Sequence, residues 1–365
     1  MSFNRILDQS LAVRTLQSAL EKDRVAHAYL FIGPAGVGRK LTASVLAKSL
    51  NCEKLRGHNP CGTCSSCHLI AEGKHPDVQT IMPTKRSSTI GVKQIEELLP
   101  IAYMRPISGK CKVFVLSEAD RMGLETANKL LKTLEEPPPS TVFVLITERP
   151  ESVLPTVASR CQPIKFGRLH TESVAQILVS DFHIDQERAS VAASLADGQV
   201  TRGLEFADPK RLDTVLGLVD ELNTCSGKLK ASDQLLEFLA EQQQSIQEEA
   251  EKKITSPDES ATASRSTLED LRKSFVDRYY RSLINDCLGL LLVFYRDILV
   301  LKETNAEELV INRNRLGMIR KHAKSMSLAA IVQNMEDIER ASKYCAHYVG
   351  EDRVFADLLM GLRTA

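Results

Sequence analysis

The chain has 365 residues, 43% of them hydrophobic and 26% charged, a composition that can bury a core and favours about two or three domains. Basic and acidic residues are equal in number, 47 of each, which excludes a protein that binds nucleic acid through bulk positive charge. Aromatic residues make up only 5% and tryptophan is absent, which favours a helix-rich chain over an all-β one.

The sequence carries no signal for export or for a membrane. Residues 1–5 lack a basic segment followed by an apolar one, so no signal peptide is predicted. The longest apolar run, residues 288–293, is far shorter than the roughly 18 residues that a membrane span needs. Nine cysteines, four of them clustered, favour reduced thiols and a metal site over a disulfide framework. We therefore predict a cytoplasmic protein.

Strand-like and helix-like segments alternate over residues 1–166. Residues 28–32, 113–116 and 142–146 are short and apolar, as buried strands are. Residues 40–50 carry apolar side chains at helical spacing, and further helical segments lie between the later strands. Strands that alternate with helices predict an α/β domain with a parallel, doubly wound sheet.

From about Leu169 onward the pattern is helical. Helices are predicted for residues 172–179, 187–195, 213–222, 268–302 and 328–349. Residues near 245–266 are polar and predict a solvated helix end followed by a flexible linker, with residues 256–266 the least able to fold. The predicted layout is an α/β domain over 1–166, a small helical domain over 167–207 and a helical C-terminal domain over 208–365.

A glycine-rich loop follows the first predicted strand. Its candidate nucleotide-binding residues are Gly33, Gly36, Gly38, Arg39 and Lys40. The spacing from Gly33 to Gly38, between a strand and a helix, matches the GxxxxGK[ST] phosphate loop, whose backbone N–H groups cradle phosphates.

The residues that would manage Mg²⁺ are altered. A working loop ends in a lysine for the terminal phosphates and a Ser or Thr that coordinates Mg²⁺, whereas this chain has Arg39 and Lys40 there. A protonated lysine has no lone pair for a metal ion, and a planar guanidinium does not reproduce a compact ammonium. Ser117, followed by Glu118, stands where an aspartate is expected after the strand at 113–116. We expect no ATP hydrolysis, and favour a plain glycine turn over nucleotide binding without hydrolysis.

Four cysteines form a C-x8-C-x2-C-x2-C cluster: Cys52, Cys61, Cys64 and Cys67. Four thiolates at this spacing suit a tetrahedral Zn²⁺ ion, and they leave no open coordination position, so the predicted zinc site is structural. Chance clustering of reduced cysteines is the alternative, and His58 and His68 are alternative ligands.

Several further segments resemble the clamp-loader branch of the AAA+ proteins. They are Ala-Asn-Lys-Leu-Leu-Lys-Thr-Leu-Glu-Glu-Pro-Pro at 127–138, Thr-Glu-Arg-Pro at 147–150, Ala-Ser-Arg-Cys at 158–161, His-Ala-Tyr at 27–29 and His-Pro-Asp at 75–77. The Tyr-Arg-Asp-Ile-Leu segment at 295–299 is similar to part of the family's collar domain. The resemblance is close over about the first 165 residues and looser beyond them.

The resemblance implies an AAA+ P-loop-type domain with a zinc knuckle at 52–67, a helical lid domain and a C-terminal collar domain for oligomerisation. Within the family, the altered loop together with the knuckle resembles the delta-prime group. Gamma/tau motor subunits have an intact loop, and delta subunits lack the knuckle. The implied partners are gamma/tau and delta subunits, the sliding clamp and primer–template DNA. The implied role is in DNA replication, within the DNA polymerase III holoenzyme and without catalysis by this chain.

The resemblance also implies roles for single residues. Arg160, in the Ser-Arg-Cys segment, would reach the ATP of a neighbouring subunit as an arginine finger. Thr147 stands at the family's sensor-1 position and Arg202 near its sensor-2 arginine. The plain alternative is a surface ion pair for Arg160 and a structural role for the other two.

Two other functions fit parts of the sequence. One is an active clamp-loader ATPase of the gamma/tau type that uses Lys40 after a one-residue slip of the loop, and intrinsic hydrolysis would distinguish it. The other is a non-replicative, zinc-dependent nucleic-acid binder, against which the zero net charge and the lack of aromatic-rich basic stretches count.

Overall fold

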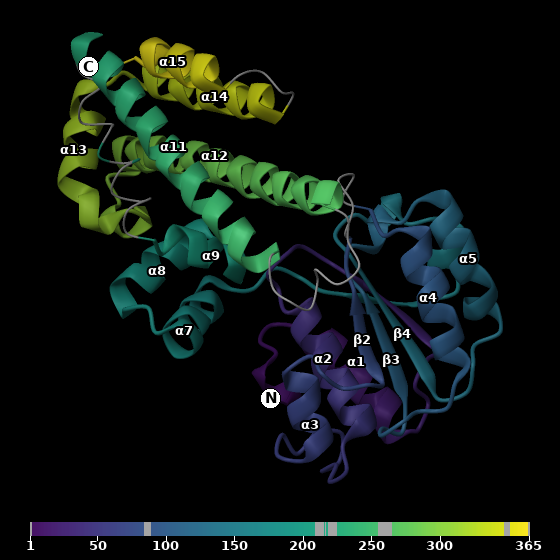
Figure 1. Cartoon of the computed structure of the whole chain (residues 1–365). Coiled ribbons are helices and arrows are strands. Elements are labelled where there is room, and N and C mark those ends of the chain that lie inside the picture. Colours follow the sequence, from purple (N-terminus) through teal and green to yellow (C-terminus); the bar gives the residue numbers. More distant parts are fainter. Residues whose placement is uncertain are drawn as a thin grey trace. The chain divides into compact units, whose positions relative to one another are not determined.

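Figure 1 shows the computed structural model of the chain, which describes residues 2–83, 89–208, 215, 217, 225–254, 265–346 and 351–363. The chain divides into two compact units. One comprises Met1–Ser173 and Gly198–Thr201, and the other comprises Val174–Asp197 and Arg202–Ala365. The finer layout, with boundaries at residues 166 and 207, stays a prediction.

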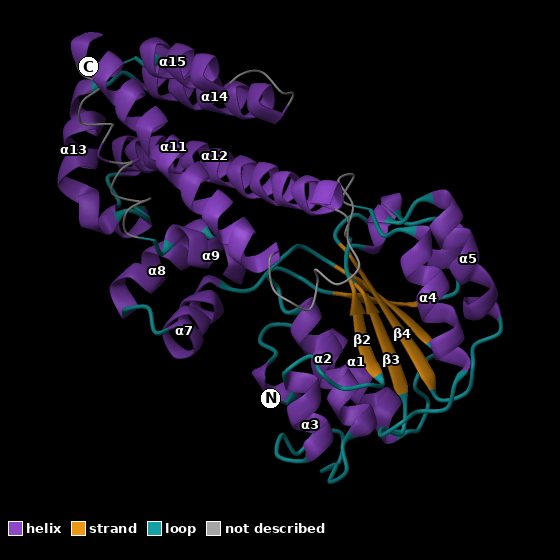
Figure 2. Cartoon of the chain, viewed as in Figure 1, coloured by secondary structure: helices purple, strands orange, loops and turns teal. Residues whose placement is uncertain are grey.

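The first unit is built on a five-stranded parallel sheet with the strand order β2-β3-β4-β1-β5. Figure 2 shows the strands of this sheet in orange. Its strands are β1 (Ala28–Ile32), β2 (Val78–Ile81), β3 (Lys112–Leu116), β4 (Thr141–Thr147) and β5 (Gln162–Lys165). The three central strands are almost fully buried, because a parallel sheet is covered on both faces. The predicted parallel sheet is confirmed, and so are its central strands. The prediction lacks the two edge strands.

Helices cover both faces of this sheet. They are η1 (Phe3–Arg5), α1 (Ser10–Glu21), α2 (Arg39–Asn51), α3 (Ser65–Ala71), α4 (Val92–Tyr103), η2 (Ala119–Arg121), α5 (Leu124–Glu135), η3 (Pro150–Ser152) and α6 (Pro155–Ala158). Successive side chains of β1 alternate between the faces. Tyr29 and Phe31 lie in one core with residues of α1 and α2, whereas Leu30 lies in the other core with residues of α4 and α5. The doubly wound arrangement is therefore present.

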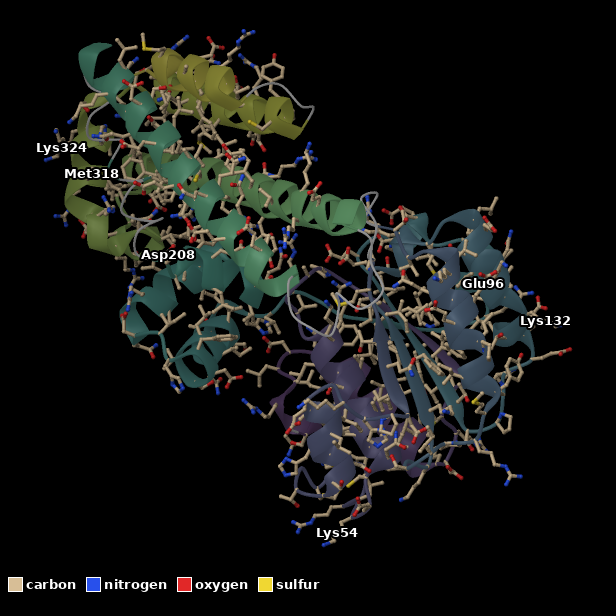
Figure 3. The ribbon with its side chains drawn as sticks, viewed as in Figure 1. Lys54, Glu96, Lys132, Asp208, Met318 and Lys324 are labelled. Carbon is tan, nitrogen blue, oxygen red and sulfur yellow. The ribbon has the colours of Figure 1, made fainter. Side chains whose placement is uncertain are left out.

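The surface of the first unit carries charges of both signs. Figure 3 labels Lys54, Glu96 and Lys132, all of which are exposed. This mixture agrees with the zero formal net charge of the whole chain.

No described residue after Lys165 lies in a strand. The helices are α7 (Thr171–Phe182), α8 (Gln186–Leu195), α9 (Val200–Phe206), α11 (Cys225–Ile254), α12 (Arg265–Thr304), η4 (Glu307–Leu309), η5 (Arg313–Arg315), α13 (Leu316–Ser325), α14 (Leu328–Ala346) and α15 (Glu351–Gly361). The predicted helical remainder of the chain is confirmed. The predicted helix at 213–222 falls almost wholly outside the described residues.

The predicted polar linker at 245–266 is helical at both of its ends. Helix α11 continues to Ile254 and α12 begins at Arg265, while residues 255–264 lie outside the described residues. The Gln, Glu, Ala and Lys residues at the end of α11 are strong helix formers, which explains why their polar composition does not end the helix.

A buried aspartate fastens the chain after α12. Asp297 is 0% exposed and accepts hydrogen bonds from the backbone N–H groups of Ile311 at 3.1 Å and Asn312 at 2.8 Å. A buried carboxylate needs such donors to offset its lost hydration. Asp297 belongs to the segment that resembles the collar domain, and its contacts here are structural.

Candidate functional site

The glycine-rich loop joins β1 to α2 at the carboxyl ends of the parallel strands. Gly36 has a φ of 69°, a left-handed conformation that favours glycine. Glycine is also required at Gly33, because an added Cβ would lie 2.5 Å from the Phe166 carbonyl oxygen. The loop therefore has the strand–loop–helix setting that its sequence predicts.

Arg39, at the lysine position of this loop, turns toward the end of β4. Its side chain is buried, and its Nη1 donates to the Thr147 carbonyl oxygen at 2.6 Å. Its Nη2 lies 3.1 Å from Oε1 of Glu148. Burial lowers the pKa of the guanidinium, and the Glu148 carboxylate partly restores it. The positive charge at this position is thus neutralised within the protein.

The carboxylates near the carboxyl ends of these strands are also paired with groups of the protein itself. Ser117, directly after β3, is 0% exposed, and its hydroxyl has no hydrogen-bond partner among the described residues. Asp120 accepts hydrogen bonds from the Thr147 hydroxyl at 2.9 Å and from Nη2 of Arg149 at 3.0 Å. Glu118 lies 2.9 Å from Nε of Arg121. The carboxylates of this turn are therefore engaged with protein cations and a hydroxyl.

Lys40, at the metal-ligand position, is exposed at the start of α2. Together with Ser44, His75 and Ser117 it lines a cavity of about 600 Å³. A Ser or Thr hydroxyl there could coordinate Mg²⁺, whereas the Lys40 ammonium is a cation beside an uncharged serine.

The four clustered cysteines come together at the end of α2 and the start of α3. The Sγ atoms of Cys52, Cys61, Cys64 and Cys67 all lie within 4.8 Å of one another. A tetrahedral zinc site with Zn–S bonds of about 2.3 Å places its sulfurs about 3.8 Å apart, so the donor set fits one ion after a small contraction. No other group of metal-ligating side chains stands out among the described residues.

Backbone N–H groups already favour a thiolate in this cluster. Cys61 Sγ accepts from the backbone N–H groups of Thr63 at 3.5 Å and Cys64 at 3.3 Å, which lowers the pKa of Cys61 to about 6. Burial instead raises the pKa of Cys67 to about 12. A bound cation would offset the unfavourable free energy of burying this thiolate. His58 contacts Glu21 at 2.9 Å and His68 is exposed, so neither joins the four sulfurs here.

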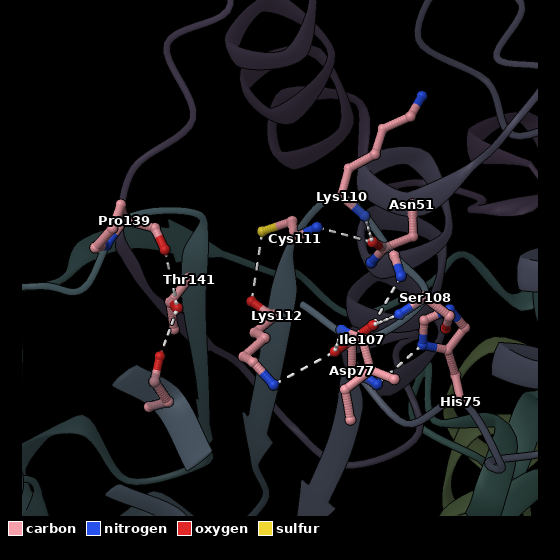
Figure 4. A network of polar contacts seen from close by, with 12 residues as sticks. Asn51, His75, Asp77, Ile107, Ser108, Lys110, Cys111, Lys112, Pro139 and Thr141 are labelled. Atoms are coloured by element: carbon pink, nitrogen blue, oxygen red, sulfur yellow. Dashed lines mark hydrogen bonds and ion pairs between the residues drawn. The ribbon is translucent and has the colours of Figure 1, made fainter. Parts of the chain in front are cut away.

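A buried polar network joins Asn51, at the end of α2, and Asp77 to the loop before β3 (Figure 4). The Asp77 carboxylate accepts from the backbone N–H groups of Ile107, Ser108 and Gly109 at 2.7–2.8 Å. Asn51 Oδ1 accepts from the backbone N–H groups of Lys110 at 2.8 Å and Cys111 at 3.0 Å. Burial alone would raise the pKa of Asp77, but these donors and Lys112 lower it to about 2. Because Asn51 directly precedes Cys52, the network holds the cluster against the start of β3.

Arg160 lies between the end of α6 and the start of β5. It is therefore at the amino ends of the parallel strands, whereas the glycine-rich loop is at their carboxyl ends. Its Nη1 donates to the Thr156 carbonyl oxygen at 2.7 Å, and its Nη2 lies 2.5 Å from Oε1 of Glu135. The side chain is 33% exposed. The fold thus separates Arg160 from Arg39 by the length of the sheet.

Arg202 makes its described contacts within the second unit. Its Nε lies 4.0 Å from Oδ1 of Asp286, and its guanidinium lies 5.5 Å from the centre of the Phe206 ring. The structure brings Arg39, Ser117 and Thr147 together at the carboxyl ends of the strands, and it gathers the four cysteines between α2 and α3. All of these positions were predicted from the sequence, whereas Asn51 was not, and Glu135 was noted only as part of the segment at 127–138, because the contacts of both depend on distant parts of the chain.

None of the described helices combines the length and the apolar character that crossing a membrane requires.

Comparison with known proteins points to one family. Residues 8–170 match the family described as DNA polymerase III, delta subunit. The chain is 35% identical to the DNA polymerase III subunit delta' of Bacillus subtilis, over 55% of this chain and 62% of that protein. It is 28% identical to subunit tau of the same bacterium, over 98% of this chain and 60% of that protein. The subunit delta' of Pseudomonas aeruginosa is 40% identical over 37% of this chain and 42% of its own length.

The chain spans about three-fifths of the length of these two Bacillus relatives. Among solved structures, a gamma subunit-related protein of Thermotoga maritima covers 95% of this chain and 96% of its own, with 16% sequence identity and a TM-score of 0.37. The family match over the first unit and the delta' and tau relatives agree with each other. The first unit is therefore similar to the clamp-loader subunits of DNA polymerase III.

Proposed function

We propose that the chain is a delta-prime subunit of the clamp loader. In this role it assembles with gamma/tau and delta subunits and helps to load the sliding clamp onto primer–template DNA during replication. Relatives named delta' and the family match over residues 8–170 support this role. The chain contributes structure and one arginine, and hydrolyses no ATP itself.

The buried guanidinium of Arg39 carries the second part of this proposal. A lysine in a working phosphate loop must extend toward the terminal phosphates. Arg39 is instead bound to the Thr147 carbonyl oxygen and to Glu148. Freeing it would leave the buried Thr147 carbonyl without this donor, and Lys40 would still repel Mg²⁺. These features support a loop that has become a structural turn.

One Zn²⁺ ion bound by Cys52, Cys61, Cys64 and Cys67 is part of the same proposal. The mutual closeness of the four sulfurs and the N–H groups that donate to Cys61 support it. The ion would supply positive charge that removes the penalty for burying thiolates, and it would tie α2 to α3. Its role is structural, since four protein ligands leave no position for a substrate.

Arg160 is proposed to act on the ATP of a neighbouring subunit. Five residues of β1 separate the level of Arg160 from the glycine-rich loop, a distance of roughly 16 Å along a strand, so Arg160 cannot serve its own loop. Its partial exposure leaves it accessible to another chain. A guanidinium that reaches a transferring phosphoryl group stabilises the charge of the transition state.

The test has two parts. The isolated chain should neither bind Mg·ATP tightly nor hydrolyse ATP, and it should co-purify with gamma/tau and delta subunits in one complex. Steady hydrolysis by the homogeneous chain would support the second candidate, an active gamma/tau-type ATPase. That candidate is favoured by the similarity to subunit tau over 98% of this chain. Failure to join a loader complex would contradict the delta-prime role itself.

A further inference from the structure

The Arg160 guanidinium is held between the ends of two helices. One acceptor is the carbonyl oxygen of Thr156 in α6, and the other is the carboxylate of Glu135, the last residue of α5. The C-terminal end of a helix carries partial negative charge, and the Glu135 carboxylate adds to it at the end of α5. A cation at this place therefore stabilises the end of α5 and is itself held in one orientation by the two acceptors.

These contacts leave part of the guanidinium unused. An arginine side chain has about five N–H donors, and the two contacts engage one donor on Nη1 and one on Nη2. No other described residue accepts a hydrogen bond from this side chain, which is 33% exposed. The remaining donors are available to an acceptor outside the chain, and the charged oxygens of a phosphate suit the planar fork of the guanidinium.

We infer that Glu135 is a positioning residue for Arg160. Its carboxylate holds the guanidinium so that the unused N–H groups meet a phosphoryl group of the neighbouring subunit. This inference rests on the proposed arginine-finger role. A long, flexible arginine loses conformational entropy when it is ordered, and a partner that orders it beforehand removes that cost from the reaction. The contribution should therefore appear in the turnover number rather than in the affinity for ATP.

The test uses the reconstituted loader with wild-type chain and the variants Arg160→Ala, Glu135→Ala, Glu135→Gln and the Arg160→Ala/Glu135→Ala double variant. The loss of clamp- and DNA-stimulated ATPase in Arg160→Ala defines the turnover that depends on Arg160. Glu135→Ala should lower the kcat of this Arg160-dependent turnover about tenfold, with little change in KM. This is the size of effect expected for losing one hydrogen bond between charged groups. Glu135→Gln keeps an acceptor oxygen and should retain most of the activity.

The neighbouring Glu136, which is also exposed, provides a matched control: Glu136→Ala should keep full turnover at equal assembly. The double variant should be no slower than Arg160→Ala alone. An Arg160→Ala loader with normal ATPase would remove the arginine-finger proposal. A slow Arg160→Ala loader beside a normal Glu135→Ala loader would remove only the positioning role. Equal losses from Glu135→Ala with and without Arg160 would reveal a general structural effect and would also overturn it.

Discussion

The Lys112 ammonium lies 3.3 Å from the Asp77 carboxylate, and both side chains are almost fully buried, with exposures of 1% and 0%. The same carboxylate also accepts three backbone N–H groups from the loop before β3. Lys112 and these N–H groups offset the burial of the Asp77 charge, and Asp77 in turn holds the loop before β3 in place.

Asp77→Asn should destabilise the first unit strongly. The substitution replaces one of the two acceptor oxygens with an NH2 donor that faces backbone N–H groups, and it leaves the Lys112 charge buried without its partner. Breaking a buried ion pair in this way costs about 3–5 kcal/mol. Urea unfolding followed by circular dichroism measures the change. The control is Glu72→Gln, which breaks an exposed pair with Lys74 and should change stability little. Equal stability of the two variants would contradict this account.

The stability of the first unit should also depend on pH through Asp77. The folded-state pKa of Asp77 is lowered to about 2, below its ordinary value of 3.8. A lowered pKa contributes stability that is fully present above pH 3.8 and is lost as the pH falls toward 2, by about 2 kcal/mol in total. Asp77→Asn lacks this titration, so its unfolding free energy should fall less over this range. Parallel pH profiles for the two proteins would contradict the prediction.

Sequence patterns predicted the centre of the first unit better than its edges. The strands β1, β3 and β4 are continuous apolar runs because helices cover both of their faces. Half of the residues in each of the edge strands β2 and β5 are polar, and β5 contains Pro163, which an edge strand tolerates, so neither shows a buried-strand pattern.

The candidate sites show a similar limit. The type of residue at Arg39 predicts a disabled loop, which stays a prediction, but it does not reveal the partner Thr147, which lies 108 residues away in the chain. Asn51 matches no local motif, and Glu135 lies in the segment at 127–138 without a role assigned from it, because the partners of both residues are brought to them only by the fold. Spacing along the chain predicted the cysteine cluster well, since its four cysteines lie within one short segment.

Purified protein should contain about one Zn²⁺ ion per chain, as measured by elemental analysis. Cys61→Ser/Cys64→Ser should lose the ion and lower the stability of the first unit, because the remaining sulfurs cannot complete a tetrahedral site. Cys345→Ser, in α14 of the second unit, is the control and should keep it. Zinc retained by the double variant would exclude this ligand set.

Arg39→Lys/Lys40→Thr should restore weak Mg·ATP binding without turnover. The lysine removes the guanidinium that binds the Thr147 carbonyl oxygen, and the threonine offers Mg²⁺ a hydroxyl. Ser117 still leaves no carboxylate after β3 to organise the metal. Isothermal titration with Mg·ATP and a phosphate-release assay separate the two steps. Hydrolysis by the double variant would show that Ser117 is not limiting.

Arg160→Lys should impair the assembled loader almost as much as Arg160→Ala. An ammonium keeps the charge, but it cannot contact the Thr156 carbonyl oxygen, Glu135 and a phosphate with the geometry of a planar fork. An arginine finger contributes roughly 10³–10⁵ in rate at the site it serves. Total ATPase should fall only in part, because other subunits serve the other sites, whereas clamp loading should fall further if all sites must act together.

The measurement is clamp- and DNA-stimulated ATPase with clamp loading, at equal assembly of wild-type and variant loaders. Arg105→Lys is a matched control. Arg105 is an exposed arginine in the loop before β3, at the amino ends of the strands like Arg160. It should leave both activities unchanged. If Arg160→Lys retained full activity while Arg160→Ala lost it, charge alone would be sufficient, and the planar hydrogen-bonding geometry assigned to Arg160 would be wrong. If both variants were fully active, Arg160 would be a surface ion pair with Glu135 and nothing more.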